Sequence, residues 1–258
     1  MKLVIKICST VLDNERVLRN FAGELGELLK QGHRVIVVHG GTRFLDQALA
    51  ELQDNGTAAV HGGKTKDAPL MVLGGKVNKK LVGILAAAGI PAFGLCGADG
   101  NIVKIRKTRS KANELNVTAE VSSVHPKWLE AICERGGVPV LANVALGSDN
   151  QHHCLNADRL AGACAISWDA DALVFLSDSD GPRDADGTVL RWLETRKIVE
   201  LTRGTAIRPN MATKLDVCHQ ALKHGVRRTR ILPLSQIESL SSFYFSRIDF
   251  GTEVIQAV

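Results

Sequence analysis

Short apolar runs and amphipathic stretches alternate along the chain. Residues 3–7, 34–38 and 172–176 are runs of β-forming residues, each followed by a polar or glycine-containing loop. Between the first two runs, residues 13–30 repeat apolar side chains every three or four positions, which predicts an amphipathic helix. A strand, helix, strand crossover makes its two strands parallel neighbours in one sheet. The pattern therefore predicts an α/β fold with a largely parallel sheet.

The remaining residues extend this alternation. We expect helices at residues 43–52, 68–88, 125–135, 194–203 and 211–224, and strands at residues 92–95, 138–143, 230–234 and 251–254. A basic, β-forming stretch predicts a hairpin within residues 104–121, and residues 147–153 are expected to form a turn. No internal repeat or low-complexity linker divides the chain.

Composition narrows the class of protein. A chain of 258 residues with 45% hydrophobic side chains can bury a sizeable core, as one large domain or as two lobes that share a sheet. The formal net charge of +5 is modest and its basic residues are mostly dispersed, so we expect anionic small molecules and no nucleic acid as ligands. One Tyr and seven Phe also provide little surface for base stacking.

Cysteine usage and the N-terminus bear on location. The six cysteines show no C-x-x-C pair and no zinc-like spacing, which is typical of reduced thiols in a cytoplasmic protein. The apolar run at the N-terminus is too short for a signal peptide or a membrane span, so no membrane partner is expected. For His39, His152 and His153 we expect structural roles, because no thiol or carboxylate stands at ligand spacing from them. No metal site built from protein side chains is therefore predicted.

The loops that follow the first two predicted strands are candidate anion-binding sites. Residues 8–10 and the segment His39-Gly40-Gly41-Thr42 fall on one edge of the predicted sheet. A glycine pair between a strand and a helix lets backbone N–H groups approach an anion, and the helix N-terminus adds partial positive charge. The alternative is purely steric, because turns after strands commonly contain glycine.

The stretch from residue 154 to residue 181 is predicted to form a helix followed by a strand. Asn156 and Asp158 open a helix rich in small residues, which can approach a sheet closely. The strand ends in the acidic loop Ser177-Asp178-Ser179-Asp180-Gly181, at the sheet edge where ligands of open α/β sheets bind. The alternative is that these carboxylates only cap a helix and form turns.

Six motifs follow one another in order over the whole chain. They are Lys6-Ile7-Cys8-Ser9, His39-Gly40-Gly41-Thr42, Gly94-Leu95-Cys96-Gly97-Ala98-Asp99-Gly100, Cys154-Leu155-Asn156-Ala157-Asp158, Ser177-Asp178-Ser179-Asp180-Gly181 and Pro209-Asn210-Met211-Ala212-Thr213-Lys214. In this order they resemble the motifs of the amino-acid kinase family, most closely those of its acetylglutamate kinase branch.

The resemblance implies a three-layer sandwich around one continuous, mostly parallel sheet. An N-terminal lobe, residues 1–155, would bind an acylamino acid and form a homodimer, and a C-terminal lobe, residues 156–258, would bind ATP. The implied activity is ATP-dependent phosphorylation of the side-chain carboxylate of an N-acylated acidic amino acid. N-acetyl-L-glutamate, which would yield N-acetylglutamyl 5-phosphate in arginine biosynthesis, is the default substrate. Mg²⁺ would be held largely by the ATP phosphates and water.

The resemblance also implies roles for individual residues. Two lysines stabilise the transferred phosphoryl group and an aspartate orients them, and these match Lys6, Lys214 and Asp158. The positions that match substrate contacts are Gly40, Gly41, Thr42, Lys64, Cys154 and Asn156. The positions that match nucleotide contacts are Ser9, Asp178, Asp180, Gly181, Asn210 and Met211.

Several positions depart from the family pattern. Cys8 and Ser9 replace a glycine pair, Thr42 replaces a glycine, Lys64 replaces a substrate-binding arginine and Cys154 replaces an asparagine. Lysine lacks the bidentate fork of arginine, and a thiol is a poorer hydrogen-bonding group than an amide. Two alternatives therefore stay open. One is a kinase of a related carboxylate, such as an acylglutamate variant or a carrier-linked aminoadipate or glutamate, with the basic run at residues 104–111 facing an acidic carrier protein. The other is a nucleotide-binding regulatory paralogue with weak catalysis.

Overall fold

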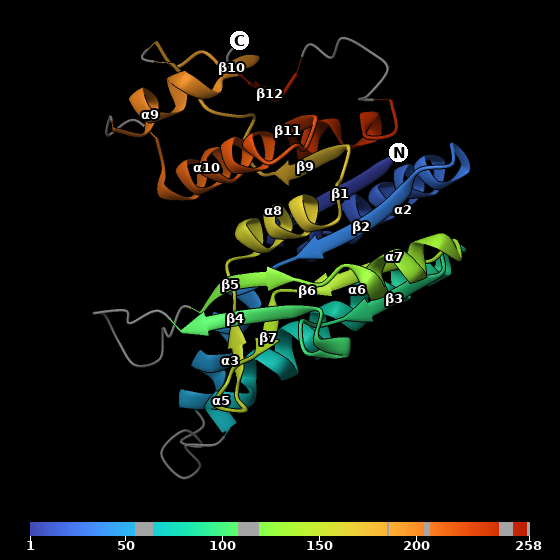
Figure 1. The fold of residues 1–258 in the computed structure, drawn as a ribbon. Coiled ribbons are helices and arrows are strands. Elements are labelled where there is room, and N and C mark those ends of the chain that lie inside the picture. Colours follow the sequence, from blue (N-terminus) through green and yellow to red (C-terminus); the bar gives the residue numbers. More distant parts are fainter. Residues whose placement is uncertain (55–63, 108–118, 185, 204–206, 243–249, 257–258) are drawn as a thin grey trace.

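An eight-stranded sheet organises the computed structural model, which describes residues 1–54, 64–107, 119–184, 186–203, 207–242 and 250–256 (Figure 1). Its strand order is β10 (Trp192–Glu194), β12 (Thr252–Ile255), β11 (Arg228–Pro233), β9 (Ala172–Ser177), β1 (Lys2–Ile7), β2 (Arg34–His39), β6 (Val138–Ala142) and β3 (Ala92–Leu95). The strands from β11 to β3 are mutually parallel, and β12 and β10 run the opposite way. The predicted α/β class with a mostly parallel sheet is confirmed.

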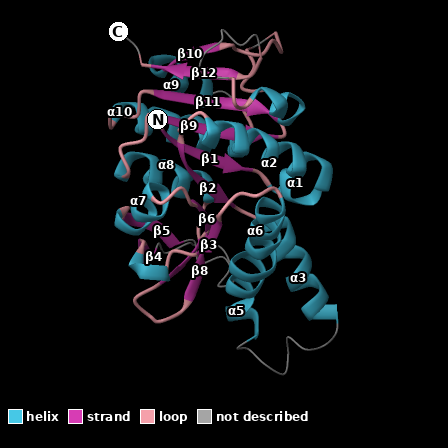
Figure 2. Ribbon diagram, turned by 90° about the vertical axis from the view of Figure 1, so that its right-hand side faces the viewer, coloured by secondary structure: helices cyan, strands magenta, loops and turns pink. Residues whose placement is uncertain are grey.

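Helices cover both faces of this sheet, which gives three layers (Figure 2). One face carries α2 (Glu15–Lys30), α3 (Thr42–Asp54), α5 (Lys64–Pro69) and α6 (Asn78–Ala87), and the other carries α7 (Lys127–Glu134), α8 (Ala157–Ser167) and α10 (Pro209–Lys223). Alternation along β1 divides its side chains between the two layers. Leu3, Ile5 and Ile7 belong to the core on the α2 side, and Val4 belongs to the core on the α8 side. Lys6 has the same parity as Val4 and therefore points toward α8.

The predicted helix over residues 13–30 begins later than expected. The chain forms a short helix, α1 (Ser9–Asp13), directly after β1, and α2 then starts at Glu15. Asn14 separates them because its side-chain oxygen accepts hydrogen bonds from the backbone N–H groups of Arg16 and Val17. The chain thus turns into a helix immediately beyond Lys6.

The predicted helix over residues 68–88 is wrong as a single regular helix. It consists of α5, a π-helical segment η1 (Leu70–Val77), and α6. Pro69 lacks the N–H that would continue a regular ladder, and Gly74 and Gly75 follow it without side chains to hold one. The wide π turn lies next to the glycine loop after β2, since Leu73 and Val77 approach Gly41.

Hairpins complete the described chain. The predicted hairpin forms from β4 (Val103–Lys107) and β5 (Ala119–Val124). A second hairpin, β7 (Val144–Leu146) with β8 (His152–Cys154), occupies the region where only a turn was expected. The remaining elements are α9 (Thr195–Arg203) and two 3₁₀ segments, η2 (Asp99–Asn101) and η3 (Leu234–Ser239). No helix of the described residues has both the length and the apolar character needed to cross a membrane.

Candidate active site

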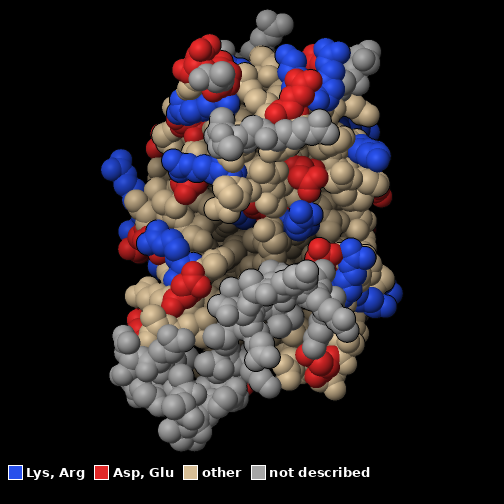
Figure 3. Space-filling model, turned by 90° about the vertical axis from the view of Figure 1, so that its left-hand side faces the viewer, with Lys and Arg blue, Asp and Glu red and all other residues tan. Residues whose placement is uncertain are grey.

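A cleft of about 470 Å³ opens at the carboxyl ends of β1, β2, β6 and β9. Because these strands are parallel, the loops that follow them all meet at one edge of the sheet. Figure 3 views the molecule from the side toward which these strands point, and basic and acidic side chains are interspersed there. The structure brings most of the predicted site residues to this cleft: Lys6, Ser9, Gly40, Gly41, Thr42, Asn156, Asp158, Asp178, Asn210, Met211 and Lys214.

Asp158 lies between two lysines at the floor of the cleft. Its carboxylate oxygens are 2.6 Å from Nζ of Lys6 and 3.1 Å from Nζ of Lys214. All three residues are more than nine-tenths buried. A buried carboxylate shared by two ammonium groups leaves the cluster with a net positive charge, which favours an anionic ligand.

Three different elements bring these side chains together. Lys6 interrupts an apolar strand and points to the α8 side of the sheet, while Asp158 lies in the first turn of α8. Asn156 caps that helix by accepting a hydrogen bond from the backbone N–H of Arg159 at 3.0 Å. Helix α10 approaches α8 so closely that a Cβ on Gly162 would lie 2.3 Å from Val217. Lys214 and Asp158 lie one turn before this contact on their helices, so the packing sets their separation.

The glycine loop after β2 forms the next wall of the cleft. Gly41 has φ +153, and a Cβ there would lie 2.8 Å from Leu73, so the backbone conformation and the space both favour glycine. His39 is fully buried at the end of β2, where Nδ1–H donates to the Gly40 carbonyl at 2.9 Å and Nε2 accepts from Asn78 at 2.9 Å. Burial lowers the pKa of His39 to about 4, although the bond to Gly40 opposes this shift. His39 is therefore neutral and holds the loop in place.

A second cavity of about 460 Å³ adjoins the cleft beyond β9. Its lining includes the predicted nucleotide residues Asp178, Asp180, Gly181 and Met211. Asp180 pairs with Arg183 at 3.2 Å, while Asp178 is exposed and makes no salt bridge within the described residues. Asp178, Met211 and Arg208 line both cavities and so mark where the two meet.

Comparison with known proteins identifies the relationship. The model of the "Amino acid kinase family" matches residues 1–233. Acetylglutamate kinase of Acidobacterium capsulatum is 41% identical over 99% of both chains, and that of Koribacter versatilis is 39% identical over the full length of both. The chain belongs to the amino acid kinase family.

Solved structures support the same fold at lower sequence identity. N-acetylglutamate synthase of Neisseria gonorrhoeae, complexed with coenzyme A and N-acetyl-glutamate, matches all of this chain with a TM-score of 0.79 at 20% identity. The chain spans 60% of that longer protein. Carbamate kinase of Giardia lamblia bound to AMP-PNP has a TM-score of 0.74 at 11% identity. The match covers 99% of this chain and 98% of the carbamate kinase chain.

Three of the positions at which this amino acid kinase departs from the family motifs, Cys8, Ser9 and Thr42, line the cleft. Cys8 is the N-cap residue of α1 and makes no side-chain capping bond, and Ser9 opens that helix. Thr42 is exposed at the first residue of α3. Both replaced loops therefore run directly into helices at the edge of the cleft, and Ser9 and Thr42 present hydroxyl groups there.

Two of the predicted substrate residues are absent from the lining of the cleft as the structure describes it, for different reasons. The side chain of Lys64 lies outside the described residues, as do residues 108–111 of the basic run. Cys154 is not among the residues that line the cleft, and its sulfur lies 3.4 Å from the amide nitrogen of Asn143, which does line it. Burial raises the pKa of the Cys154 thiol to about 11, against a smaller lowering by the Asn143 N–H group. Cys154 is therefore a neutral thiol beside Asn143.

Asn143, Arg43 and Arg208 line the cleft of this amino acid kinase but were not singled out from the sequence. Asn143 directly follows the apolar strand β6, so a polar residue at a strand end was the available signal. Arg43 pairs with Asp13 at 3.0 Å. Arg208 forms no salt bridge within the described part of the chain, and only its place beside the Pro209 motif pointed to it.

No group of three or more metal-ligating side chains occurs among the described residues.

One expectation about histidines was wrong in detail, because His153 has a carboxylate partner. Its Nε2 lies 3.0 Å from Asp149, in the turn between β7 and β8. The pair closes the hairpin that precedes Asp158.

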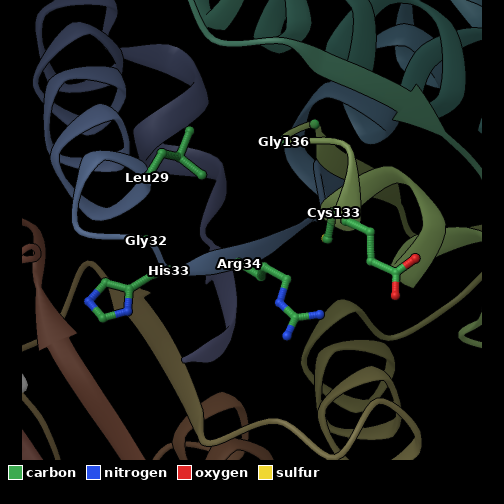
Figure 4. Close-up of a pocket in the computed structure, with 8 residues that line it drawn as sticks. Leu29, Gly32, His33, Arg34, Cys133 and Gly136 are labelled. Atoms are coloured by element: carbon green, nitrogen blue, oxygen red, sulfur yellow. The ribbon is translucent and has the colours of Figure 1, made fainter.

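Another cavity, of about 430 Å³, lies at the opposite edge of the sheet, where β2 begins (Figure 4). Leu29, His33, Arg34 and Cys133 are among the residues that line it. Arg34 pairs with Glu130, and His33 lies 3.4 Å from the N-terminal ammonium group. This cavity holds none of the residues predicted to act in phosphoryl transfer.

Proposed function

We propose that this protein transfers the γ-phosphoryl group of ATP to the side-chain carboxylate of N-acetyl-L-glutamate, yielding N-acetylglutamyl 5-phosphate in arginine biosynthesis. The observation that carries the proposal is the buried cluster of Lys6, Asp158 and Lys214 at the floor of the cleft. The full-length relatives named acetylglutamate kinase, at 41% and 39% identity, support the choice of substrate.

The cluster suits phosphoryl transfer because the two reactants repel each other. A carboxylate must approach a triphosphate, and the charge on the transferred group spreads over its oxygens in the transition state. Lys6 and Lys214 supply positive charge there, and Asp158 holds both ammonium groups in place before the substrates bind. Removing one such preorganised donor typically costs about 3–4 kcal/mol, or roughly a hundred- to thousandfold in turnover.

The two reactants would approach from opposite sides of this cluster. The glycine loop after β2 and the N-terminus of α3 suit the carboxylates of the acylamino acid, so we assign the acyl substrate to residues 1–155. The cavity beyond β9 and the N-terminus of α10 suit ATP, so we assign the nucleotide to residues 156–258. Arg208 lies where the cavities meet and provides a third cation for the phosphate chain.

Among the carboxylates of the predicted site at the cleft, Asp178 is the one that could bind Mg²⁺. Mg²⁺ would neutralise charge on the ATP phosphates, and it prefers phosphate, water and carboxylate oxygens. Asp158 is occupied by two lysines, whereas Asp178 is exposed at the junction of the cavities and available to a hydrated ion. We also propose a cytoplasmic homodimer that forms through the N-terminal half, as the family resemblance implies.

The decisive experiment measures ADP release by the purified protein with Mg-ATP. The panel contains N-acetylglutamate, N-succinylglutamate, N-acetylaminoadipate and a blank without acceptor. We expect turnover with N-acetylglutamate, a loss of about a hundredfold or more in Lys214→Ala, and near-normal turnover in Lys223→Ala. Lys223 is exposed at the far end of the same helix and provides a matched control.

Other outcomes would redirect the assignment. Turnover with only the succinyl or aminoadipate compound would favour a kinase of a related carboxylate. Silence across the panel, with ATP still raising the melting temperature, would favour a binding protein without catalysis. Equal turnover in Lys214→Ala and the wild type would remove Lys214 from the mechanism.

A further inference from the structure

Asn143 carries a polar atom for which the described part of the chain offers no partner. The residue is 2% exposed and lines the cleft. Its Oδ1 makes no hydrogen bond with any described residue. Leaving a buried amide oxygen without a donor is unfavourable, so such an atom on a residue that lines the cleft calls for an explanation.

The orientation of the amide follows from its neighbours. Nδ2 donates to the Leu155 carbonyl at 2.5 Å and points a second hydrogen toward the Cys154 sulfur at 3.4 Å. A carbonyl oxygen can only accept, so the end of the amide that faces Leu155 must be the nitrogen. Both hydrogens of the nitrogen are thereby used, and the buried oxygen is the end of the amide for which the described residues offer no donor.

The place of Asn143 in the sheet assigns it to one of the two reactants. Ala142 pairs with His39 across β6 and β2, so Asn143 lies beside Gly40, the first residue of the glycine loop. Strands β2 and β1 separate it from β9, beyond which the second cavity lies. Asn143 therefore belongs to the side of the cleft assigned above to the acyl substrate, and the inference rests on that proposed function.

We propose that Asn143 Oδ1 accepts a hydrogen bond from the amide N–H of the N-acylated substrate, and so selects acylated over free amino acids. Carboxylates and phosphates carry only acceptors at neutral pH, so the acylamide N–H is the donor that the acyl substrate can offer this oxygen. A free amino acid would bring an ammonium group instead. One neutral oxygen cannot neutralise that charge, and Lys6 and Lys214 would repel it.

An isosteric pair of substrates tests the contact. N-acetylglutamate has an N–H group where its ester analogue, 2-acetoxyglutarate, has an oxygen that would face Oδ1 lone pair to lone pair. We expect the wild type to favour the amide by at least about 30-fold in kcat/KM, and Asn143→Leu to reduce this preference to about threefold or less. The KM for ATP should stay unchanged in the variant, while the KM for N-acetylglutamate rises about 10- to 100-fold.

The amide-to-ester ratio separates recognition from structural damage. Asn143→Leu also leaves the Leu155 carbonyl unpaired, but both substrates meet the same altered site, so this effect largely cancels in the ratio. Asn143→Ala serves if the leucine variant does not fold. The same Asn→Leu change at Asn20, which is partly exposed and bonded to Glu238 away from the cleft, should preserve the ratio.

Each result decides the inference. An undiminished preference for the amide in Asn143→Leu and Asn143→Ala would overturn it and leave Asn143 as a clamp on Leu155. If the wild type turned over neither compound, the proposed function would fail, and calorimetric dissociation constants of both compounds would provide the ratio instead. A binding preference for the amide that Asn143→Leu abolishes would still support the contact, and no binding of either compound would overturn both proposals.

Discussion

Neutralising Asp158 perturbs the site most directly. Asp158→Asn keeps the shape of the side chain but removes the negative charge between Lys6 and Lys214, which are both more than nine-tenths buried. Both ammonium groups lie within about 8 Å of each other, so at an effective dielectric constant of about 20 their repulsion is roughly 2 kcal/mol. Removing one partner of a buried ion pair typically costs about 3–5 kcal/mol. We expect the free energy of unfolding of the ligand-free protein to fall by this amount, and the melting temperature by roughly 10 °C.

ATP should partly repair the variant because its phosphates supply the missing negative charge. We therefore expect saturating Mg-ATP to raise the melting temperature of Asp158→Asn by more degrees than that of the wild type, even though turnover falls about a hundredfold. Urea unfolding at pH 7 measures the loss of stability, and ADP release measures turnover. Asp216→Asn is the control, because the Asp216–Arg159 pair is about half exposed and contributes about 1 kcal/mol at most. If the free energy of unfolding of Asp158→Asn differed from that of the wild type by less than about 1 kcal/mol, the reasoning on the buried cluster would be refuted.

Four further predictions follow from single contacts. Arg208→Ala should raise the KM for ATP about tenfold and leave the KM for N-acetylglutamate unchanged in steady-state kinetics, since a lost charged hydrogen bond costs about 1.5–3 kcal/mol; equal shifts in both would contradict its place on the phosphate chain. Gly41→Ala should lower stability by about 1–3 kcal/mol in urea unfolding, because the new Cβ would lie 2.8 Å from Leu73 and φ is +153. Burial lowers the pKa of His39 to about 4, so the wild type should lose roughly 3 kcal/mol as the pH falls from about 6.5 to 4, and His39→Gln should lack this part of the acid dependence. Burial raises the pKa of Glu130, but hydrogen bonds from Lys2 and Trp168 and nearby charges outweigh burial and lower the pKa overall. Glu130→Gln should therefore lower the free energy of unfolding by about 1–3 kcal/mol at pH 7, and this loss should shrink as the pH falls below about 4.

Much of the fold could be predicted from the sequence, because the spacing of apolar residues in strands differs from that in helices. The apolar runs of β1, β2 and β9 and the amphipathic stretch of α2 are long and regular enough to predict parallel crossovers. The π-helical segment η1 was not readable, because its register depends on packing against the glycine loop and not on apolar spacing. The hairpin of β7 and β8 was missed because three-residue strands carry too little alternation to recognise.

Part of the candidate site could also be predicted from the sequence, and part became visible only in the structure. Lys6 could be selected from the sequence because a lysine within an apolar strand needs a reason, and Asp158 and Lys214 followed from ordered motifs. The resemblance implied that Asp158 orients both lysines, but no local pattern brings Asp158 to Lys214, which is 56 positions away. The two meet because α8 and α10 pack closely at Gly162. Asn143 and Arg208 belong to no motif, and their relevance became visible only through a missing hydrogen-bond partner and a place between two cavities.

The sequence by itself thus determined the class of fold, the edge of the sheet at which most of the predicted site residues gather and the residues that match family motifs, because these depend on local periodicity and on residue type. Tertiary structure alone decided which charges touch, which side chains are buried and which polar atoms lack partners. Cys154 illustrates the difference, since its motif position predicts a substrate contact, whereas the cleft is lined by its neighbour Asn143 and not by Cys154. Distances between residues far apart in the chain are set by how helices and strands pack, and no local pattern encodes them.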